Sequence, residues 1–447
     1  MARMIEKLRG NPWAVLATLS LGFFMTLLDL TIVNIAIPGM MTSLHAPLDL
    51  VLWTVGAYSL VLAALVVTAA RLGDLLGQRT MFAWGIAVFT LASAGCGLAP
   101  GPAALIAARI VQGIGAALLT PQTMALIVAT FPAARRGTAL GVWGSVAGVA
   151  TLAGPTLGGF LCSALGWRWI FFVNVPVGLL VLVMTFLFVP GLRTGRAHRL
   201  DPSGILLSSS ALACVAFALM EGQRFGWNPA IWALAAAGLV LGALFLRHQG
   251  RRQDSGPLIP FVLFRDRNFA VMTVLIGAVG AAMVGAVLPL GLLLQQGLGL
   301  SAVQAGLALA PSPLVSLLVS PFAGRLADRI GGRRVLLAGL LAYVLGLAVI
   351  APLATASAQA LTFALPLALM GLGVGCMIAP MSTEAMRNVP PALAGAAAGI
   401  SNTVRQLGSV FGTAGTTALL ASGVSFQLVL LLPIGLLTAA ALVVRGG

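Results

Sequence analysis

The first long apolar run of the chain ends in the segment LLDLTIVNIAIP, residues 27–38, which carries the carboxylate of Asp29 among apolar neighbours. A charged side chain in the centre of a membrane helix costs about 2.5–3.5 kcal/mol on insertion scales, so it is usually paired, neutralised or turned toward a water-filled cavity. Because burial and nearby cations shift the pKa of a carboxyl group in opposite directions, such a group is suited to carrying protons. We predict that role for Asp29. In the alternative, Asp29 only forms hydrogen bonds to Thr26, Thr31 or Asn34.

The composition is that of a polytopic membrane protein. Of the 447 residues, 60% are hydrophobic and only 8% are charged, a balance that soluble globular domains do not have. The net charge of +15 comes from short basic clusters between apolar runs, so we do not expect nucleic-acid binding. The four cysteines and three histidines are scattered, so we expect neither a disulfide framework nor a metal site.

Apolar runs of about 20 residues are long enough to cross a hydrocarbon core of about 30 Å. We predict an all-α fold of fourteen spans, at residues 13–37, 50–70, 80–99, 103–130, 137–163, 168–190, 203–221, 229–246, 268–296, 301–323, 333–353, 359–383, 393–420 and 424–444. The first run follows a short basic stretch and has no Ala-x-Ala cleavage pattern, so we expect a retained span rather than a removed signal peptide.

The positions of the basic residues predict the orientation of the chain. Most of the 25 Lys and Arg residues fall in alternate connectors between the spans, and such connectors stay on the cytoplasmic side. Losing one span would mix the two sets of connectors. We therefore expect an even number of spans, a location in the plasma membrane and both termini in the cytoplasm.

A ten-residue pattern occurs twice, as ARLGDLLGQR at residues 70–79 and as GRLADRIGGR at residues 324–333. Repeated halves with a binding site between them are the build of many secondary transporters. We predict an N-terminal six-helix bundle over residues 1–190 and a C-terminal six-helix bundle over residues 268–447. Residues 191–267 then form two additional transmembrane helices with basic cytoplasmic connectors.

These motifs resemble those of the major facilitator superfamily. Its Gly-x-Leu-x-Asp-x-x-Gly-x-Arg loop is complete at residues 324–333, whereas Ala70 replaces the first Gly of the earlier copy. Residues 105–115 resemble the fourth-span motif of the family. Residues 154–159 resemble its fifth-span antiporter motif, although Ala150 stands where an upstream Gly is usual.

Two further segments, residues 28–34 and 167–176, are similar to patterns of the fourteen-span drug/proton antiporter branch. The resemblance covers essentially the whole chain. It implies the fold of that superfamily, with two six-helix bundles and two extra helices between them, and export of lipophilic, often cationic, small molecules in exchange for protons.

Arg109 is the predicted partner of Asp29. Asp29 lies about sixteen residues into an outward-running span and Arg109 about six into an inward-running one, which are comparable depths at 1.5 Å per residue. Because Arg cannot lose its charge, it needs an acceptor when buried. The resemblance likewise implies that Arg109 influences protonation near the first span. We predict that Arg109 controls the proton on Asp29, directly or through Gln112; otherwise backbone carbonyls alone hold it.

The second half has no acid between Asp266 and Asp328, so we place proton coupling in the first half. In the second half, a polar stripe on one helix face consists of Asn402, Arg405, Gln406 and Ser409. This stripe either lines the cavity or forms an interhelical network. We predict that the residues lining the substrate cavity are Thr26, Asn34, Gln112, Asn402, Arg405 and Gln406.

The repeated loop places charges at unfavourable helix ends. Asp74 ends a helix at its negative pole and Arg79 begins one at its positive pole, so each should find a partner elsewhere. We predict that Asp74 pairs with Arg135 or Arg136 in a cytoplasmic latch that one transport state makes and the other breaks; in the alternative, the charges only fix topology. The predicted latch residues are Gly73, Asp74, Arg79, Arg135, Arg136, Gly324, Asp328 and Arg333.

The antiporter motif comprises Gly154, Pro155, Gly158 and Gly159. Pro155 lacks an amide N–H and lets its helix bend, while the glycines permit close backbone contact. The motif therefore serves either as a seal against leak or simply as a packing surface.

The leading functional prediction is a proton-driven exporter of lipophilic or cationic small molecules that works by alternating access. It would need substrate, protons and the bilayer, but no cofactor, and we expect a monomer. Alternatives are export of a specific metabolite, such as an antibiotic made by the host cell, and proton-coupled import. A membrane enzyme or a channel is a further alternative, but the sequence shows no phosphate-binding loop, metal-ligand cluster or nucleophile constellation, which argues against an enzyme.

Overall fold

The structure is a computed structural model. It describes residues 10–132, 135–191, 201–222, 224–253, 257–300, 302–353, 360–390 and 393–446. Throughout these residues every regular element is a helix. Part of the predicted basic connector after the first half, residues 192–200, lies outside the described residues.

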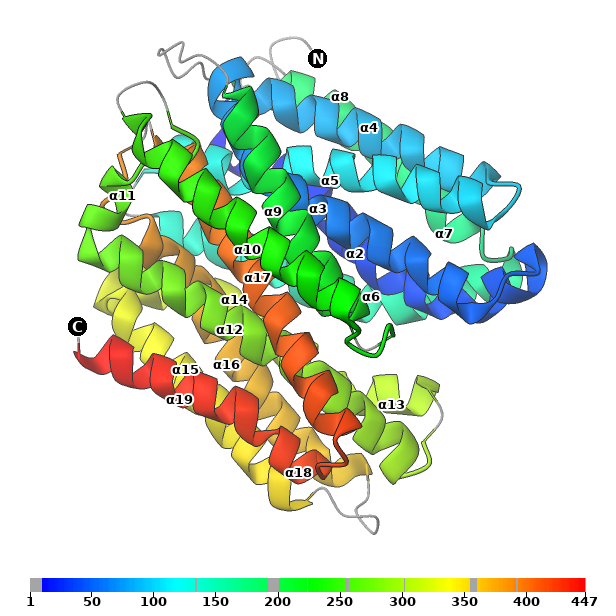
Figure 1. Cartoon of the computed structure of the whole chain (residues 1–447). Coiled ribbons are helices and arrows are strands. Elements are labelled where there is room, and N and C mark those ends of the chain that lie inside the picture. Colours follow the sequence, from blue (N-terminus) through cyan, green and yellow to red (C-terminus); the bar gives the residue numbers. More distant parts are fainter. Residues whose placement is uncertain are drawn as a thin grey trace.

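The first helices of the chain form one packed group, the upper helices in Figure 1. We call this group the N-half. It comprises α2 (Pro12–Leu44), α3 (Leu48–Leu76), α4 (Gln78–Leu98), α5 (Pro102–Thr130), α6 (Arg136–Ala164), α7 (Trp169–Phe172) and α8 (Asn174–Phe188).

A second packed group, the C-half, fills most of the lower part of Figure 1. It comprises α12 (Arg267–Leu292), α13 (Ala302–Leu309), α14 (Pro311–Ile330), α15 (Gly332–Leu353), α16 (Ala364–Ala385), α17 (Ala394–Ala421), α18 (Phe426–Val429) and α19 (Leu431–Gly446). A π-helical turn (Leu293–Gly297) follows α12, and a 3-10 turn (Ala360–Phe363) precedes α16.

Two helices lie between these groups in the sequence, α9 (Pro202–Glu221) and α10 (Pro229–Gly250), followed by the short α11 (Val262–Arg265). Helices α9 and α10 pack against each other, and α9 also packs against α3 and α17. Buried Asp201 ties their ends together, because it accepts hydrogen bonds from Gly204 N of α9 (3.0 Å) and from Gln249 Nε2 (2.9 Å) and Arg252 Nη1 (2.7 Å) at the end of α10.

Local sequence explains where several helices begin. Pro12, Pro202 and Pro229 each occupy a first-turn position, where the missing N–H costs nothing. Asn11 and Asn228 precede two of these prolines and accept hydrogen bonds from the first-turn amides of Trp13 (2.9 Å) and Ile231 (3.0 Å), as N-cap residues do.

The repeated loop also has a local explanation. Gly77 separates α3 from α4 at φ 98°, and Gly331 separates α14 from α15 at φ 96°. Only glycine adopts this backbone region without strain. The second Gly of the motif therefore makes the same tight turn in both halves.

Twelve helices in the described part of the chain are long and apolar enough to cross a membrane. In three of them, α7 with α8, α13 with α14 and α18 with α19, a break interrupts the predicted span. Two more long helices, α6 with 29 residues and α17 with 28, run through the bundle and are rich in Gly, Ala, Ser and Thr.

The N-half meets the C-half along two seams. In one, α6 packs against α14 and α16; in the other, α3 and α5 pack against α17. Both seams depend on small residues. A Cβ atom on Gly141 would lie 2.6 Å from Ser320 O of α14, and one on Gly399 would overlap the side chain of Ala70 on α3. Such close backbone approach is what small residues permit at membrane helix interfaces.

Candidate functional site

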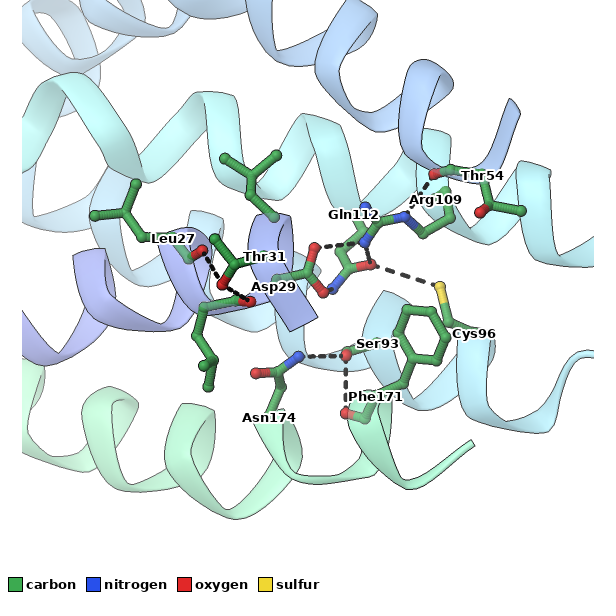
Figure 2. A network of polar contacts seen from close by, with 12 residues as sticks. Leu27, Asp29, Thr31, Thr54, Ser93, Cys96, Arg109, Gln112, Phe171 and Asn174 are labelled. Atoms are coloured by element: carbon green, nitrogen blue, oxygen red, sulfur yellow. Dashed lines mark hydrogen bonds and ion pairs between the residues drawn. The ribbon is translucent and has the colours of Figure 1, made fainter. Parts of the chain in front are cut away.

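Asp29, Arg109 and Gln112 lie together in the N-half (Figure 2). Asp29 projects from α2, and the other two lie one turn apart on α5. All three side chains are completely buried. The structure thus brings together the two residues predicted for proton coupling and the glutamine predicted to connect them.

Both oxygens of Asp29 are occupied. Arg109 Nη1 donates to Asp29 Oδ2 (2.5 Å), and Gln112 Nε2 donates to Asp29 Oδ1 (2.9 Å). Arg109 Nη1 also donates to Gln112 Oε1 (2.8 Å), which closes a three-membered ring of polar contacts. Both predicted routes from Arg109 to Asp29, direct and through Gln112, are therefore present.

The arginine is held from a third helix as well. Arg109 Nε donates to the backbone oxygen of Thr54 on α3 (2.8 Å), and the ring of Tyr58, one turn further along, lies 4.3 Å from Arg109 Cζ. Cys96 Sγ of α4 donates to Gln112 Oε1 (3.5 Å). Thr54, Tyr58 and Cys96 were not predicted from the sequence. Tyr58 could have been noticed because it is one of only two tyrosines.

A neighbouring network fixes the junction between α7 and α8. Asn174 Nδ2 donates to Ser93 Oγ (3.1 Å), which donates to Phe171 O (2.9 Å). The ring of Phe171 in turn lies 5.8 Å from Arg109 Cζ. Residues 167–176, noted in the sequence as a motif, therefore contribute part of the wall around the buried arginine.

Thr26, Thr31 and Asn34 do not hold the carboxylate of Asp29. Their side chains donate instead to backbone oxygens of their own helix, at Phe23 (2.7 Å), Leu28 (3.0 Å) and Leu30 (3.1 Å) respectively. The alternative in which Asp29 bonds only to these residues is wrong, because intrahelical carbonyls already satisfy them. Asn34 is exposed and Thr26 is buried.

The polar stripe of the C-half lies on α17. Arg405 Nη2 donates to Asn402 Oδ1 (3.0 Å), and Ser409 Oγ donates to Arg405 O (2.9 Å). Asn402 is buried, while Arg405 and Gln406 are half-buried. The structure does not join this stripe to Asp29 by any hydrogen bond or ion pair between described residues.

The two loop aspartates reach across the seams to the opposite half. Asp328, at the end of α14, accepts hydrogen bonds from Gly137 N, Thr138 N and Thr138 Oγ1 at the start of α6, each 3.0 Å long. Asp74, at the end of α3, lies against Gly395 at the start of α17, close to the backbone N–H of Ala396. Each aspartate thus caps the positive end of a helix in the other half.

These contacts correct the predicted latch pairing. Asp74 lies against the start of α17 rather than beside Arg135 or Arg136, and the positive charge that acts on it most strongly is that of Arg71, three residues earlier on α3. Arg136 Nε donates to Phe131 O (3.3 Å), and Arg135 is exposed.

Three of the other latch residues, Arg79, Arg333 and Gly73, contact helices of their own half. Arg79 Nη2 donates to Phe186 O of α8 (3.0 Å), and Arg333 Nη2 donates to Asn268 Oδ1 of α12 (3.1 Å). Gly73 packs against the side chain of Gln122 on α5. Gly324 differs, because it lies in the α6–α14 seam against the backbone of α6.

The antiporter motif faces α2. A Cβ atom on Gly154 would overlap the side chain of Thr31, and one on Gly158 would lie 2.8 Å from Ile32 Cγ1. A Cβ atom on Gly159 would meet nothing within 4 Å. The side chain of Pro155 lies outside the described residues. Two of the four motif residues therefore permit close packing of α6 on the helix that carries Asp29.

Known proteins share both the sequence and the fold. Multidrug resistance protein Stp of Mycobacterium tuberculosis is 38% identical over 414 residues, which is 91% of this chain and 76% of that protein. The tetracenomycin C resistance and export protein of Streptomyces glaucescens is 35% identical over 420 residues, 93% of this chain and 77% of that one.

Among solved structures, the human organic anion transporter MFSD10 superposes with a TM-score of 0.72 over 97% of this chain and 99% of its own. Its sequence identity is 16%, so the likeness shows the fold alone. Two overlapping segments of the chain, residues 19–218 and 203–413, match the family described as Major Facilitator Superfamily. The chain belongs to the Major Facilitator Superfamily, whose members are transporters and not enzymes.

Proposed function

We propose that the protein exports lipophilic small molecules across the plasma membrane in exchange for protons, by alternating access. Relatives named for multidrug resistance and for antibiotic resistance and export support the export of drug-like compounds. The observation that carries the proton coupling is the buried ring of Asp29, Arg109 and Gln112. No cofactor is required, because the proton gradient supplies the energy.

Protonation of Asp29 would change the energy of this ring sharply. Arg109 keeps its charge, so a neutral Asp29 leaves a buried cation without its counter-ion. Removing one partner of a buried ion pair costs about 3–5 kcal/mol. We infer that protonation favours a rearrangement of α2 against α5 and α3, and that this rearrangement couples the proton to cargo release.

The reciprocal caps supply the conformational part of the proposal. Asp74 and Asp328 each join the N-half to the C-half at the end of the bundle that carries the repeated loops. We infer that this end is closed when both caps are made, and that alternating access requires both to break. From the basic connectors we infer that this end, and both termini, face the cytoplasm.

We further propose fourteen spans and a monomer. The twelve apolar helices become fourteen when α6 and α17 are counted, since each is roughly 40 Å long at 1.5 Å per residue. Their Gly-rich faces pack against α2 and α12, which fits helices that cross the membrane inside the bundle rather than at its surface.

Export of one specific metabolite on the same fold is the second candidate. It is favoured by the relative that is named for both resistance to and export of tetracenomycin C. A panel of lipophilic compounds tested for uptake into inverted membrane vesicles would separate the two candidates, because a multidrug exporter accepts several unrelated compounds and a dedicated one accepts few.

The exchange itself is tested by proton release. In inverted vesicles with an acidic lumen, adding a transported dye should release protons from the lumen and concentrate the dye inside. Glu221→Gln is the control for loss of a carboxylate outside the site, and it should release protons as the wild-type protein does. Glu221 lies at the end of α9 and pairs with Arg224 (3.2 Å). Dye uptake with no proton movement in the wild-type protein would refute antiport.

A further inference from the structure

Arg405 is a positive charge on the inward face of α17. One face of α17 packs against α12 through Gly408 and Gly412, and another packs against α3 through Gly395 and Gly399. At 100° per residue, Arg405 and the stripe around it lie between these two faces. Phe411, on the opposite side of the helix, is 54% exposed and faces outward. The stripe therefore faces the interior of the bundle.

The guanidinium group of Arg405 has donors to spare. Its one side-chain hydrogen bond to a described residue runs from Nη2 to Asn402 Oδ1 (3.0 Å). The side chain packs beside Gly280 of α12, where an added Cβ would lie 3.3 Å from Arg405 Cγ. It nevertheless keeps part of its surface accessible. A solute inside the bundle could therefore reach it.

No described carboxylate neutralises Arg405. The acidic side chains that the structure describes are Asp29, Asp74, Asp201, Glu221, Asp266, Asp328 and Glu384, and none of them forms an ion pair with it. Arg109, which also lies well inside a predicted span, forms an ion pair with Asp29. No described acid balances the charge of Arg405 in the same way.

We propose that Arg405 binds an anionic group of the cargo, such as a carboxylate or phenolate, so that acidic lipophilic compounds are the preferred substrates. This inference rests on the proposed export function and reverses the expectation of cationic cargo. A guanidinium group presents planar paired donors that match a carboxylate. Asp29 is unavailable to a cation while Arg109 and Gln112 occupy both of its oxygens.

An anionic cargo also changes the electrical balance of transport. An anion leaving the cell and a proton entering it each make the inside of the cell more positive. The inside-negative membrane potential therefore drives both movements. Collapsing the potential while keeping the pH difference should slow the export of an acidic dye. It should leave unchanged the export of a monovalent cation exchanged for one proton, because that exchange moves no net charge.

The test uses three dyes, anionic fluorescein, cationic rhodamine 6G and neutral Nile red. Their binding to the purified full-length protein is measured by fluorescence polarisation, and their uptake is measured in inverted vesicles. Arg405→Gln should weaken fluorescein binding about ten- to a hundred-fold, the range expected for loss of a charged hydrogen bond. Arg405→Lys should restore much of it. Nile red binding should change less than about twofold in both variants, which also shows that they are folded.

Arg334→Gln is the matched control, because it removes an exposed positive charge at the start of α15. Unchanged fluorescein binding in Arg405→Gln, or an equal loss in Arg334→Gln, would overturn the assignment. A wild-type protein that pumps rhodamine 6G or Nile red but not fluorescein would overturn it too, and would leave the export function standing. A wild-type protein that pumps none of the three would remove the export function and this inference with it.

Discussion

Replacing Asp328 with alanine should loosen the α6–α14 seam and shift the balance between transport states. Asp328 accepts three 3.0 Å hydrogen bonds from the first turn of α6. Loss of an N-cap residue costs about 0.5–2 kcal/mol, and loss of a negative charge at a helix N-terminus about 0.3–1 kcal/mol. The closed cytoplasmic end should therefore lose roughly 1–3 kcal/mol, which corresponds to a 5- to 150-fold shift in the equilibrium.

Asn is itself a good N-cap residue, so Asp328→Asn should lose only the charge and shift the equilibrium by about five-fold or less. Spin labels at Arg135 and Arg329, which are exposed on opposite sides of this seam, report the opening as a distance distribution. The native cysteines are replaced in all samples.

Asp266→Ala is the control for this series. Asp266 caps α12 through Asn268 N (2.8 Å), and the cap lies within the C-half. Its loss should cost similar energy but leave the distances across the seam unchanged. The reasoning fails if Asp328→Ala shows the wild-type distribution, or if Asp266→Ala widens the distribution by as much.

Three other changes have expected outcomes. Arg109→Ala leaves the buried charge of Asp29 without its partner and should destabilise the detergent-solubilised protein by about 3–5 kcal/mol in denaturant unfolding. Burial disfavours the charged form of Asp201, but hydrogen bonds from His248 and neighbouring groups outweigh this and hold its pKa below the usual range. The ionised carboxylate therefore contributes its full stabilising effect above about pH 4, and this effect is lost as the pH falls further. Asp201→Asn should therefore flatten the acid limb of a plot of Tm against pH. Gly154→Val should lower both Tm and the transport rate, because a side chain there would overlap that of Thr31. Gly159→Val should change neither quantity, because a Cβ atom there meets nothing within 4 Å.

Much of the site could be predicted because helix geometry converts sequence position into depth. Counting residues along two oppositely running spans placed Asp29 and Arg109 at the same level, and the three-residue spacing placed Gln112 beside Arg109. The carbonyl of Thr54 could not be predicted, since a backbone acceptor has no sequence signature. Tyr58 contacts Arg109 only because α3 packs against α5.

The partner of Asp74 was missed for a related reason. Helix-dipole reasoning correctly indicated that this carboxylate needs positive charge, but it considered only the arginines that follow the fourth span. Arg71 on the same helix and the backbone N–H of Ala396 at the start of α17 supply it instead, and Gly395 and Gly399 let α17 approach this closely. The same spacing recurs at Gly137 and Gly141 in the other half. Comparing the two halves residue by residue would have located both caps.

The most direct test of the account concerns the carboxylate of Asp29 alone. Asp29→Asn keeps the side-chain volume and an oxygen acceptor for Arg109 but cannot exchange a proton. Dye uptake into inverted vesicles is measured with and without a pH difference, beside dye exchange at equal concentrations on both sides. The account predicts that vesicles carrying the Asp29→Asn variant exchange dye but no longer concentrate it in response to the pH difference. Wild-type accumulation by this variant under the same pH difference would contradict it.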